Sequence, residues 1–305
     1  MPSQSAANAP AQETATPIAG PRAAVAACAM LTVVLWASTF PGTRFVLQSF
    51  SPLPLALLRL GSAGLALALW AAVARLAPPA RRDWVAFLLY GFVGVTLASV
   101  TLIQGLTQVS AGAGSFLVGT IPIFSALLAR AYLGEQLKPV AWVGIAISFL
   151  GVLLIAFGEG QGMRVNLGAG WILASALCQS IYYVGQKPYL RRYSAAQWSA
   201  YTIIIGGALL LPLAGWLIPE VRVAPWQATA VAAYLGVFPI ALAFVAWSYA
   251  LARAKAAHVT SAMYTMPAMA ITLAYFWLGE VPHALSLAGG ATALAGVAVV
   301  TFWGR

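Results

Sequence analysis

Ten apolar segments follow one another along this chain, and each is long enough to cross a lipid bilayer. About 20 apolar residues span the hydrocarbon core, and Pro, Gly or charged residues mark nearly every gap between segments. Because a bilayer offers no water to open backbone groups, the segments must be helices. The sequence predicts an all-α integral membrane protein with ten transmembrane helices at 22–43, 52–73, 84–105, 110–132, 139–157, 168–187, 195–217, 226–250, 257–278 and 284–303.

Composition supports this class and excludes others. The chain is 62% hydrophobic and 7% charged, whereas soluble domains carry about 25% charged residues. A net charge of +10 is compatible with nucleic-acid binding only if basic residues gather on one face. Here the basic residues form short clusters between apolar segments, so no nucleic-acid partner is expected.

The chain also contains an internal repeat. Residues 109–135 align without a gap with residues 254–280, so that Pro122 falls on Pro267 and one Leu-Gly-Glu sequence falls on the other. Each copy holds five predicted helices, an odd number, so the second copy must be inverted relative to the first. Inverted repeats are typical of alternating-access carriers, which bind substrate near the midplane between the copies.

The repeat and the basic residues define the expected domains and orientation. We expect five-helix repeats at 22–157 and 168–303, a periplasmic linker at 158–167, and a disordered cytoplasmic tail at 1–21. Basic residues favour the cytoplasmic side. With both termini there, the outer side holds only Arg44, Arg164 and Arg222, and Arg59 lies within the second helix. The cytoplasmic side then holds twelve of the 16 Lys and Arg residues: Arg22, Arg75, Arg81, Arg82, Arg130, Lys138, Lys187, Arg191, Arg192, Arg253, Lys255 and Arg305.

The first helix of each repeat carries a polar and aromatic stripe. At an offset of 143 residues, Trp36, Thr39, Phe40 and Thr43 superpose on Gln179, Tyr182, Tyr183 and Gln186, and this spacing places each set on one helix face. Polar groups at membrane depth usually face a bundle interior or a watery cavity, although interhelical packing uses the same residue types. Helices three, four, eight and nine contribute further candidates. The candidate substrate-binding residues are Trp36, Thr39, Phe40, Gln104, Ser115, Gln179, Tyr182, Tyr183, Trp247 and Tyr264.

A second group has expected gating or structural roles. Pro122 and Pro267 each remove a helical hydrogen bond, which produces either a static kink or a gating hairpin. Glu135 and Glu280 end equivalent helices at opposite membrane faces. We expect each to form an ion pair, or a hydrogen bond to a neighbouring helix end, rather than to contact substrate. Arg44 and Lys187 also occupy equivalent positions of the two repeats.

Several sites are not indicated. No Asp or Glu lies deep in a predicted helix, so no carboxylate is apparent for ion coupling, and no Asp pair for intramembrane proteolysis. There is no Walker sequence. Cys28 and Cys178 fall inside apolar segments, and His258 and His283 stand alone. No cofactor, disulfide or metal site is therefore expected.

Three motifs resemble a known family. Residues 36–44, WASTFPGTR, resemble the first-helix signature of the EamA-type transporters of the drug/metabolite transporter superfamily. Leu57-Leu58-Arg59 resembles their second-helix arginine, and Pro122 with Leu133-Gly134-Glu135 resembles the close of their repeat. The resemblance covers residues 22–303. It implies a ten-helix carrier of the bacterial inner membrane whose central cavity is bounded by helices 1, 3, 4, 6, 8 and 9. Ala37 stands where the family usually has Gly.

The expected function is secondary transport, not an enzyme reaction. Amides, hydroxyls and aromatic rings in the stripes favour export of small neutral or zwitterionic metabolites, amino acids foremost, by alternating access through the central cavity. One alternative is a nucleotide-sugar or phosphate-ester exchanger that uses Arg44, Lys187 and Arg59. Another is a membrane enzyme or assembly factor with a lipid-facing site. The partners would be the metabolite and the lipid bilayer, and a monomer is compatible with the sequence.

Overall fold

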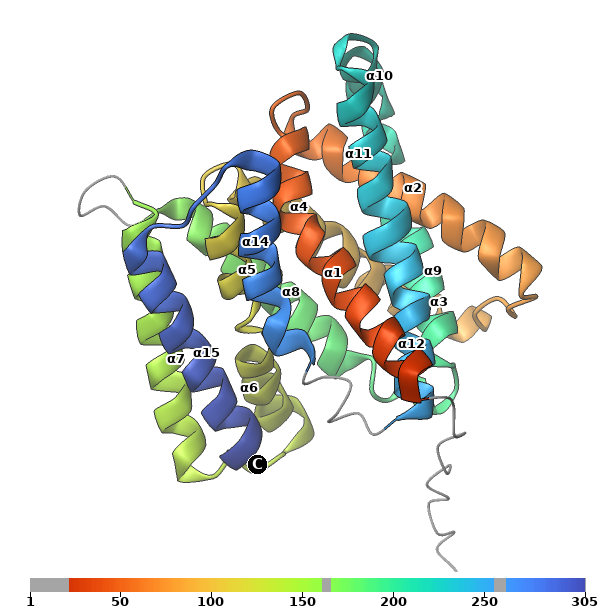
Figure 1. Ribbon diagram of the computed structural model, residues 1–305. Coiled ribbons are helices and arrows are strands. Elements are labelled where there is room, and N and C mark those ends of the chain that lie inside the picture. Colours follow the sequence, from red (N-terminus) through yellow and green to blue (C-terminus); the bar gives the residue numbers. More distant parts are fainter. Residues whose placement is uncertain (1–21, 161–165, 255–261, 305) are drawn as a thin grey trace, which may run out of the picture.

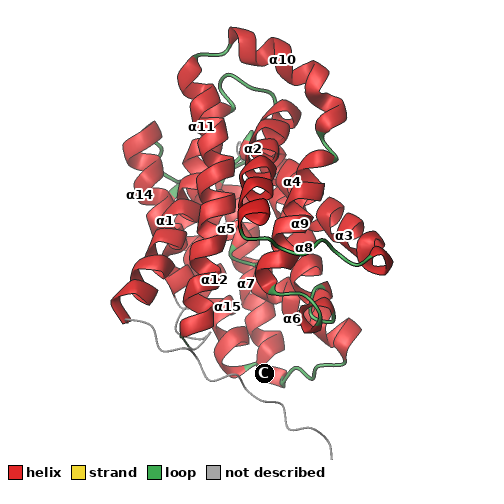
Figure 2. Cartoon of the chain, turned by 90° about the vertical axis from the view of Figure 1, so that its right-hand side faces the viewer, coloured by secondary structure: helices red, strands yellow, loops and turns green. Residues whose placement is uncertain are grey.

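The computed structural model describes residues 22–160, 166–254 and 262–304 (Figures 1 and 2). Every element within these ranges is helical, and no strand occurs in them. The predicted tail at 1–21, half of the predicted linker and the start of the ninth predicted helix lie outside the described residues. The first repeat contains α1 (Arg22–Val46), α2 (Pro52–Val73), η1 (Arg81–Asp83), α3 (Trp84–Tyr90), η2 (Gly91–Leu97), α4 (Ala98–Leu106), α5 (Ala111–Val118), α6 (Ile121–Leu133) and α7 (Pro139–Gly158).

The second repeat contains α8 (Leu167–Gly185), η3 (Tyr189–Arg191), α9 (Ala195–Ala208), η4 (Leu211–Leu213), α10 (Ala214–Val223), α11 (Trp226–Gly236), η5 (Val237–Leu242), α12 (Ala243–Arg253), η6 (Ala262–Thr265), α14 (Met266–Leu278) and α15 (Ala284–Trp303). In this repeat, the span equivalent to α2 is divided into α9, η4 and α10. Among the described residues, nine helical spans are long and apolar enough to cross a membrane, and Ala262–Leu278 forms a shorter apolar helix. The predicted ten-helix membrane fold is confirmed.

The start of α1 and the end of α15 lie at the same end of the molecule (Figures 1 and 2). We call this the terminal end, and the opposite one the distal end. Arg44, in the last turn of α1, therefore lies at the distal end, whereas Lys187, which follows α8, lies at the terminal end. This placement is the consequence of inversion: equivalent residues of the two repeats occupy opposite ends.

The last helices of the repeats, α7 and α15, pack together through glycines. A Cβ atom at Gly144 would lie 2.8 Å from the carbonyl oxygen of Gly296, and one at Gly151 would lie 2.5 Å from that of Gly289. The Ser148 hydroxyl donates to the Ala293 carbonyl at 3.1 Å. Small residues allow close backbone approach between membrane helices. The two glycine contacts are equivalent under the 145-residue offset, so this antiparallel pair joins the repeats symmetrically.

The segments expected as continuous helices at 84–105 and 226–250 are interrupted by π-helical turns, η2 and η5. These two segments occupy equivalent positions in the repeats. A π-helical turn changes the backbone hydrogen-bond register and is often found at functional sites. In η2, the Thr96 hydroxyl reaches across to the Gly206 carbonyl of α9 at 2.8 Å. Hydrophobic periodicity does not reveal these turns, because they shift the helix by one residue without a break.

The prolines of the repeat begin helices rather than bend them. The predicted helix at 110–132 divides into α5 and α6, and Pro122 is the second residue of α6. Pro267 is likewise the second residue of α14, after the short turn η6. A proline in the first turn of a helix loses no intrahelical hydrogen bond. The expectation that each proline removes a bond inside a helix is therefore wrong, while the helix does break just before each one.

Candidate functional site

The repeated Leu-Gly-Glu sequences are two matching helix ends. Gly134 and Gly279 have φ angles of 69° and 68°, in the left-handed region that glycine adopts without a Cβ penalty. The next amides bond back over the last turn, from Glu135 to the Ala129 carbonyl and from Glu280 to the Ala274 carbonyl, both at 3.3 Å. The glycine thus ends the helix and holds the following Glu at its tip, once at each end of the molecule.

At the distal end, Glu280 forms an ion pair with Arg44 through Nε and Oε1. Nη1 of Arg44 donates to the carbonyls of Leu106 and Val109, each at 2.9 Å. The other carboxylate oxygen of Glu280 accepts from the amide of Ala111 at 3.1 Å. Both side chains are largely covered, at 29% and 21% exposed. The pair therefore connects α1, the end of α4, the start of α5 and the end of α14.

At the terminal end, Lys187 Nζ lies 2.7 Å from Glu135 Oε1. These side chains are more exposed, at 48% and 38%. Arg44 is the repeat equivalent of Lys187, and Glu280 is that of Glu135, so the two ion pairs are one contact present twice. Each pair joins the first helix of one repeat to the fourth helix of the other. We call them the distal pair and the terminal pair.

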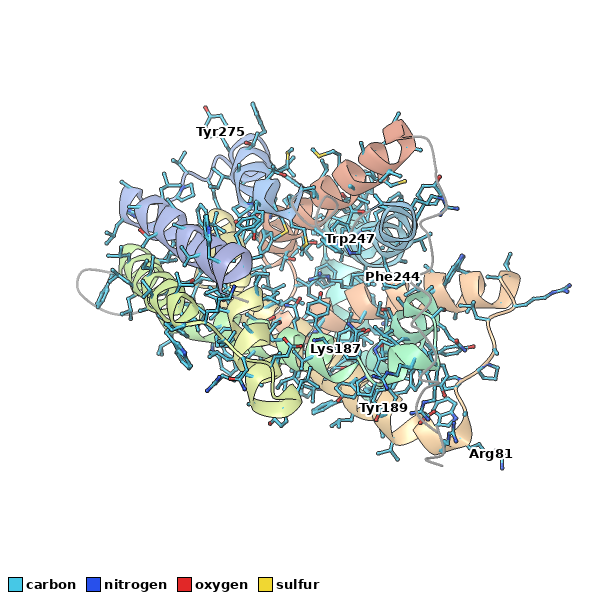
Figure 3. All side chains as sticks on the ribbon, turned by 90° about the horizontal axis from the view of Figure 1, so that it is seen from below. Arg81, Lys187, Tyr189, Phe244, Trp247 and Tyr275 are labelled. Atoms are coloured by element: carbon cyan, nitrogen blue, oxygen red, sulfur yellow. The ribbon has the colours of Figure 1, made fainter. Side chains whose placement is uncertain are left out.

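The structure brings together two of the predicted binding residues, Trp36 of α1 and Trp247 of α12. Their ring centroids are 5.2 Å apart, at an interplanar angle of 48°. The Trp36 indole also donates to the Pro239 carbonyl of η5 at 2.9 Å. Viewed from the terminal end, Trp247, Phe244 and Lys187 lie in the middle of the molecule, whereas Arg81 and Tyr275 lie at its periphery (Figure 3).

The stripe of α8 divides between two environments. Tyr183 is 44% exposed, and Gln179 is half-buried, with Nε2 donating to Ser175 Oγ at 3.2 Å. Tyr182 instead lies in an aromatic core with Phe87 and Trp198. Its hydroxyl hydrogen-bonds to Ser199 and Thr202 of α9, both at 3.1 Å. Tyr182 therefore fixes α8 to α9, and we leave it out of the proposed binding site.

Other predicted residues also pack inside the helix bundle. Phe40 lies in an apolar cluster with Leu106 and Phe116, and the buried Ser115 hydroxyl donates to the Gly112 carbonyl of its own helix at 2.6 Å. We leave both out of the proposed site. Thr39 is buried, Gln104 is half-buried on α4, and Tyr264 packs against Phe302 of α15. A hollow of about 360 Å³ lies beside Glu135 at the terminal end, apart from the Trp36–Trp247 pair.

Sequence reasoning missed a buried carboxylate at the terminal end. Tyr193 donates to Asp83 Oδ2 at 2.7 Å, and Arg192 Nη2 lies 3.1 Å from Oδ1. Burial raises the pKa of Tyr193, and its hydrogen bond to Asp83 adds to this. The contact joins the loop after α2 to the loop after α8. No repeat or spacing links these loops, so the sequence carried no signal for it.

It also missed the role of Glu159 at the distal end. This residue lies in a stretch that reads as a flexible link, yet it follows the last residue of α7 directly. Its carboxylate accepts from the Ser110 amide at 2.7 Å, the Ser110 hydroxyl at 3.0 Å and the Ser286 hydroxyl at 2.9 Å. Glu159 therefore fastens the starts of α5 and α15 to the end of α7.

The model of the EamA-like transporter family matches residues 24–157 and again residues 166–302. The chain belongs to the EamA-like transporter family. It is 38% identical to the "Probable terminal-alkyne amino-acid exporter" of Streptantibioticus cattleyicolor over 271 residues, which cover 89% of this chain and 91% of that protein. It is also 38% identical to the "Uncharacterized transporter YdfC" of Bacillus subtilis, over 88% of this chain and 87% of that protein.

One solved crystal structure shares the fold of this EamA-like transporter, with a TM-score of 0.61 and 18% identity over 93% of this chain and 97% of that chain. The family and the relatives establish a multi-pass membrane transporter rather than an enzyme. The fold and the two matched repeats agree with the resemblance seen in the first-helix and Leu-Gly-Glu motifs.

Proposed function

We propose that this EamA-like transporter exports small zwitterionic metabolites, amino acids foremost, across a bacterial inner membrane. The observation that carries this proposal is the pairing of Arg44 with Glu280 and of Lys187 with Glu135. Phosphate esters are bound through strong contacts to Arg or Lys, and these two cations are already neutralised by carboxylates. Arg59 is the one other cation of the exchanger alternative, and the remaining candidate groups are indoles, a phenol and amides, which suit a compact zwitterionic metabolite.

A relative supports the same substrate class. The Streptantibioticus cattleyicolor protein is named an amino-acid exporter, and it aligns with 89% of this chain at 38% identity. We propose a binding site formed by Trp36 and Trp247 on one side and by Gln179 and Tyr183 of α8 on the other. Aromatic faces attract ammonium groups, and amides and hydroxyls form hydrogen bonds with the polar groups of such a metabolite.

The proposed mechanism is alternating access with one ion pair closing each end. α6 and α14 each contain 13 residues, begin at a helix break followed by proline, and end at the paired Glu. Each is therefore a rod of about 20 Å with a break at one tip and a gate contact at the other. Rotation of a rod about its break would separate its Glu from the first helix of the other repeat. Since the repeats are inverted, the two rods open opposite ends.

We infer that both termini, and hence the terminal end, face the cytoplasm. The charge distribution carries this inference, because the predicted topology assigns twelve basic residues to that side and three to the other. A fluorescent protein fused after Arg305 should fluoresce. Alkaline phosphatase fused at the same point should be inactive, and an active phosphatase fusion would reverse the orientation.

Counterflow in sealed proteoliposomes tests the substrate class. Vesicles preloaded with an unlabelled mixture of the twenty amino acids should accumulate each labelled amino acid that the protein carries, above protein-free vesicles. A second set of protein-containing vesicles is preloaded with unlabelled hexose phosphates and nucleotide sugars. This set should not accumulate the labelled forms of those esters. Uptake of the esters alone would contradict the proposal and favour the exchanger. No flux of either class would favour a function other than transport of these metabolites.

A further inference from the structure

Arg59 is a buried cation within α2. The residue is 6% exposed, and its Nε and Nη1 atoms are buried without a hydrogen-bond partner among the described residues. A charge held away from water without a partner is strongly unfavourable in a folded protein. The folded chain therefore bears a cost at this position that some interaction has to offset.

The carboxylates of the described residues are all engaged elsewhere. Glu280 and Glu135 pair with Arg44 and Lys187, and the other three are held as follows: Asp83 by Tyr193 and Arg192, Glu159 by Ser110 and Ser286, and Glu220 by Ser51. Of the six acidic residues in the chain, only Glu13 lies outside these ranges. No described carboxylate is thus the counter-ion of Arg59, and an anion from outside the protein can fill that role.

Arg59 is placed for an anion in the helix bundle and not for a lipid headgroup. It lies seven residues from the start of α2, which corresponds to about 10 Å of helix in a hydrocarbon core about 30 Å thick. The lipid-facing side of α2 carries Leu65 and Leu69, at 65% and 62% exposed. The Arg59 backbone packs on α11 instead, where a Cβ atom at Gly236 would lie 2.1 Å from the Arg59 carbonyl oxygen.

A second unpartnered group borders the same turn of α11. Thr43 of α1 is fully buried, and its hydroxyl has no hydrogen-bond partner in the part of the chain that the structure describes. Its neighbour Gly42 packs on Leu235, with a Cβ atom there lying 2.9 Å from the leucine side chain. Leu235 precedes the Gly236 that contacts Arg59. The backbone of Arg59 and the residue before Thr43 therefore contact one turn of α11, and both side chains hold donors without a partner among the described residues. A guanidinium with a nearby hydroxyl is a combination that suits a carboxylate.

We propose that Arg59 and Thr43 bind the carboxylate of the exported metabolite. This inference rests on the proposed function and adds the chemical group by which the substrate is recognised. Thr43 is next in sequence to Arg44 of the distal pair. Both ion pairs are formed in this structure, and the subsite is correspondingly closed. Opening of either end would admit the substrate.

The first test measures thermal stability and does not depend on the substrate. Replacing Arg59→Met removes the unpaired charge and keeps an apolar stem, so the ligand-free protein should melt at a higher temperature than the wild type. The matched control is Arg81→Met, an exposed arginine outside α2, which should leave the melting temperature unchanged. Sodium acetate, compared with sodium chloride at equal ionic strength, should stabilise the wild type and Arg81→Met but not Arg59→Met.

A lower melting temperature for Arg59→Met would overturn the proposal, because it would show that the guanidinium already has a stabilising partner. Equal stabilisation of Arg59→Met and wild type by acetate would also overturn it. Inorganic phosphate is the third probe. Stabilisation by phosphate that exceeds that by acetate would assign the subsite to phosphate esters instead of carboxylates.

The second test uses counterflow with the amino acid that the wild type carries fastest, and with its carboxamide. Arg59→Met should raise the half-saturating concentration of the amino acid about 10- to 150-fold, as for a lost hydrogen bond to a charged group. Arg59→Lys should recover part of this loss, and carboxamide flux should change less than 3-fold. Equal effects on both compounds would refute carboxylate recognition. If the wild type carries no amino acid, the proposed function fails, while the stability test still decides whether Arg59 binds a carboxylate.

Discussion

The two ion pairs should differ in strength, although they are equivalent by symmetry. In the distal pair, Glu280 and Arg44 are largely covered and make three further hydrogen bonds to backbone groups. A hydrogen bond to a charged group contributes about 1.5–3 kcal/mol. In the terminal pair, Lys187 and Glu135 are more exposed, and an exposed ion pair contributes about 0.2–1 kcal/mol. Neutralising the two Glu residues should therefore give unequal effects.

We predict that Glu280→Gln increases the fraction of molecules open at the distal end about 10- to 150-fold. Glu135→Gln should increase the fraction open at the terminal end about 5-fold or less. Both factors follow from the energies above, since 1.4 kcal/mol corresponds to a factor of ten. The assay is the labelling rate of Thr39→Cys, a buried α1 position between the two ends, in a Cys28→Ala, Cys178→Ala background. A membrane-impermeant maleimide is applied to right-side-out and to inside-out vesicles.

Salt provides an internal control for this comparison. A concentration of 1 M salt screens exposed charges strongly, so it should abolish the small effect of Glu135→Gln and leave most of the Glu280→Gln effect. The free-energy change of distal opening in the double variant Arg44→Gln, Glu280→Gln should not exceed the sum of the free-energy changes in the two single variants. Equal effects of the two Glu substitutions, or labelling that increases from the wrong side, would refute the assignment of the pairs as gates.

Three further predictions follow from individual contacts. Tyr183→Ala should weaken substrate binding in counterflow about 5- to 150-fold, as for an unpaired polar group left in a site, whereas Tyr182→Phe should lower stability and leave binding within 3-fold. Gly151→Leu should destabilise the α7–α15 contact by more than about 1–3 kcal/mol, measured by thermal unfolding against Gly170→Leu, which has open space around it. Tyr193→Phe should lower the free energy of unfolding by about 1.5–3 kcal/mol at neutral pH. Because the folded pKa of Tyr193 is raised, this contribution is complete just below about pH 10 and declines as pH rises through the raised pKa. The decline should be absent from the pH profile of the variant.

The sequence predicted the membrane spans and the repeats because both depend on local composition and alignment. It also indicated an ion-pair role for Glu135 and Glu280, although it could not identify their partners. Arg44 aligns with Lys187 at an offset of 143 residues, whereas Glu135 aligns with Glu280 at an offset of 145. The two alignments do not show that a cation of one repeat meets a carboxylate of the other, and only the folded chain does.

The binding residues were harder to predict, because helical periodicity defines a face but not what covers it. Tyr182 and Tyr183 are adjacent in one stripe, yet α9 covers the first and leaves the second partly exposed. Phe40 had the expected spacing and Ser115 was a further candidate, and both still lie in the core. Arg59 gave the opposite case. Its sequence context resembles a family motif, but only the three-dimensional contacts show that it has no counter-ion within residues 22–160, 166–254 and 262–304.

The most direct test of the two-gate mechanism is a pair of distance measurements between spin labels in the full-length protein in liposomes. One pair of labels, at Gln48 and Val281, reports on the distal end, and the other, at Gln136 and Arg191, reports on the terminal end. The mechanism predicts that substrate and the Glu280→Gln change shift the populations so that a long distance at one end accompanies a short distance at the other. Long distances at both ends of the same molecule, measured with spectroscopically distinct label pairs at the two ends, would contradict alternating access and indicate a channel.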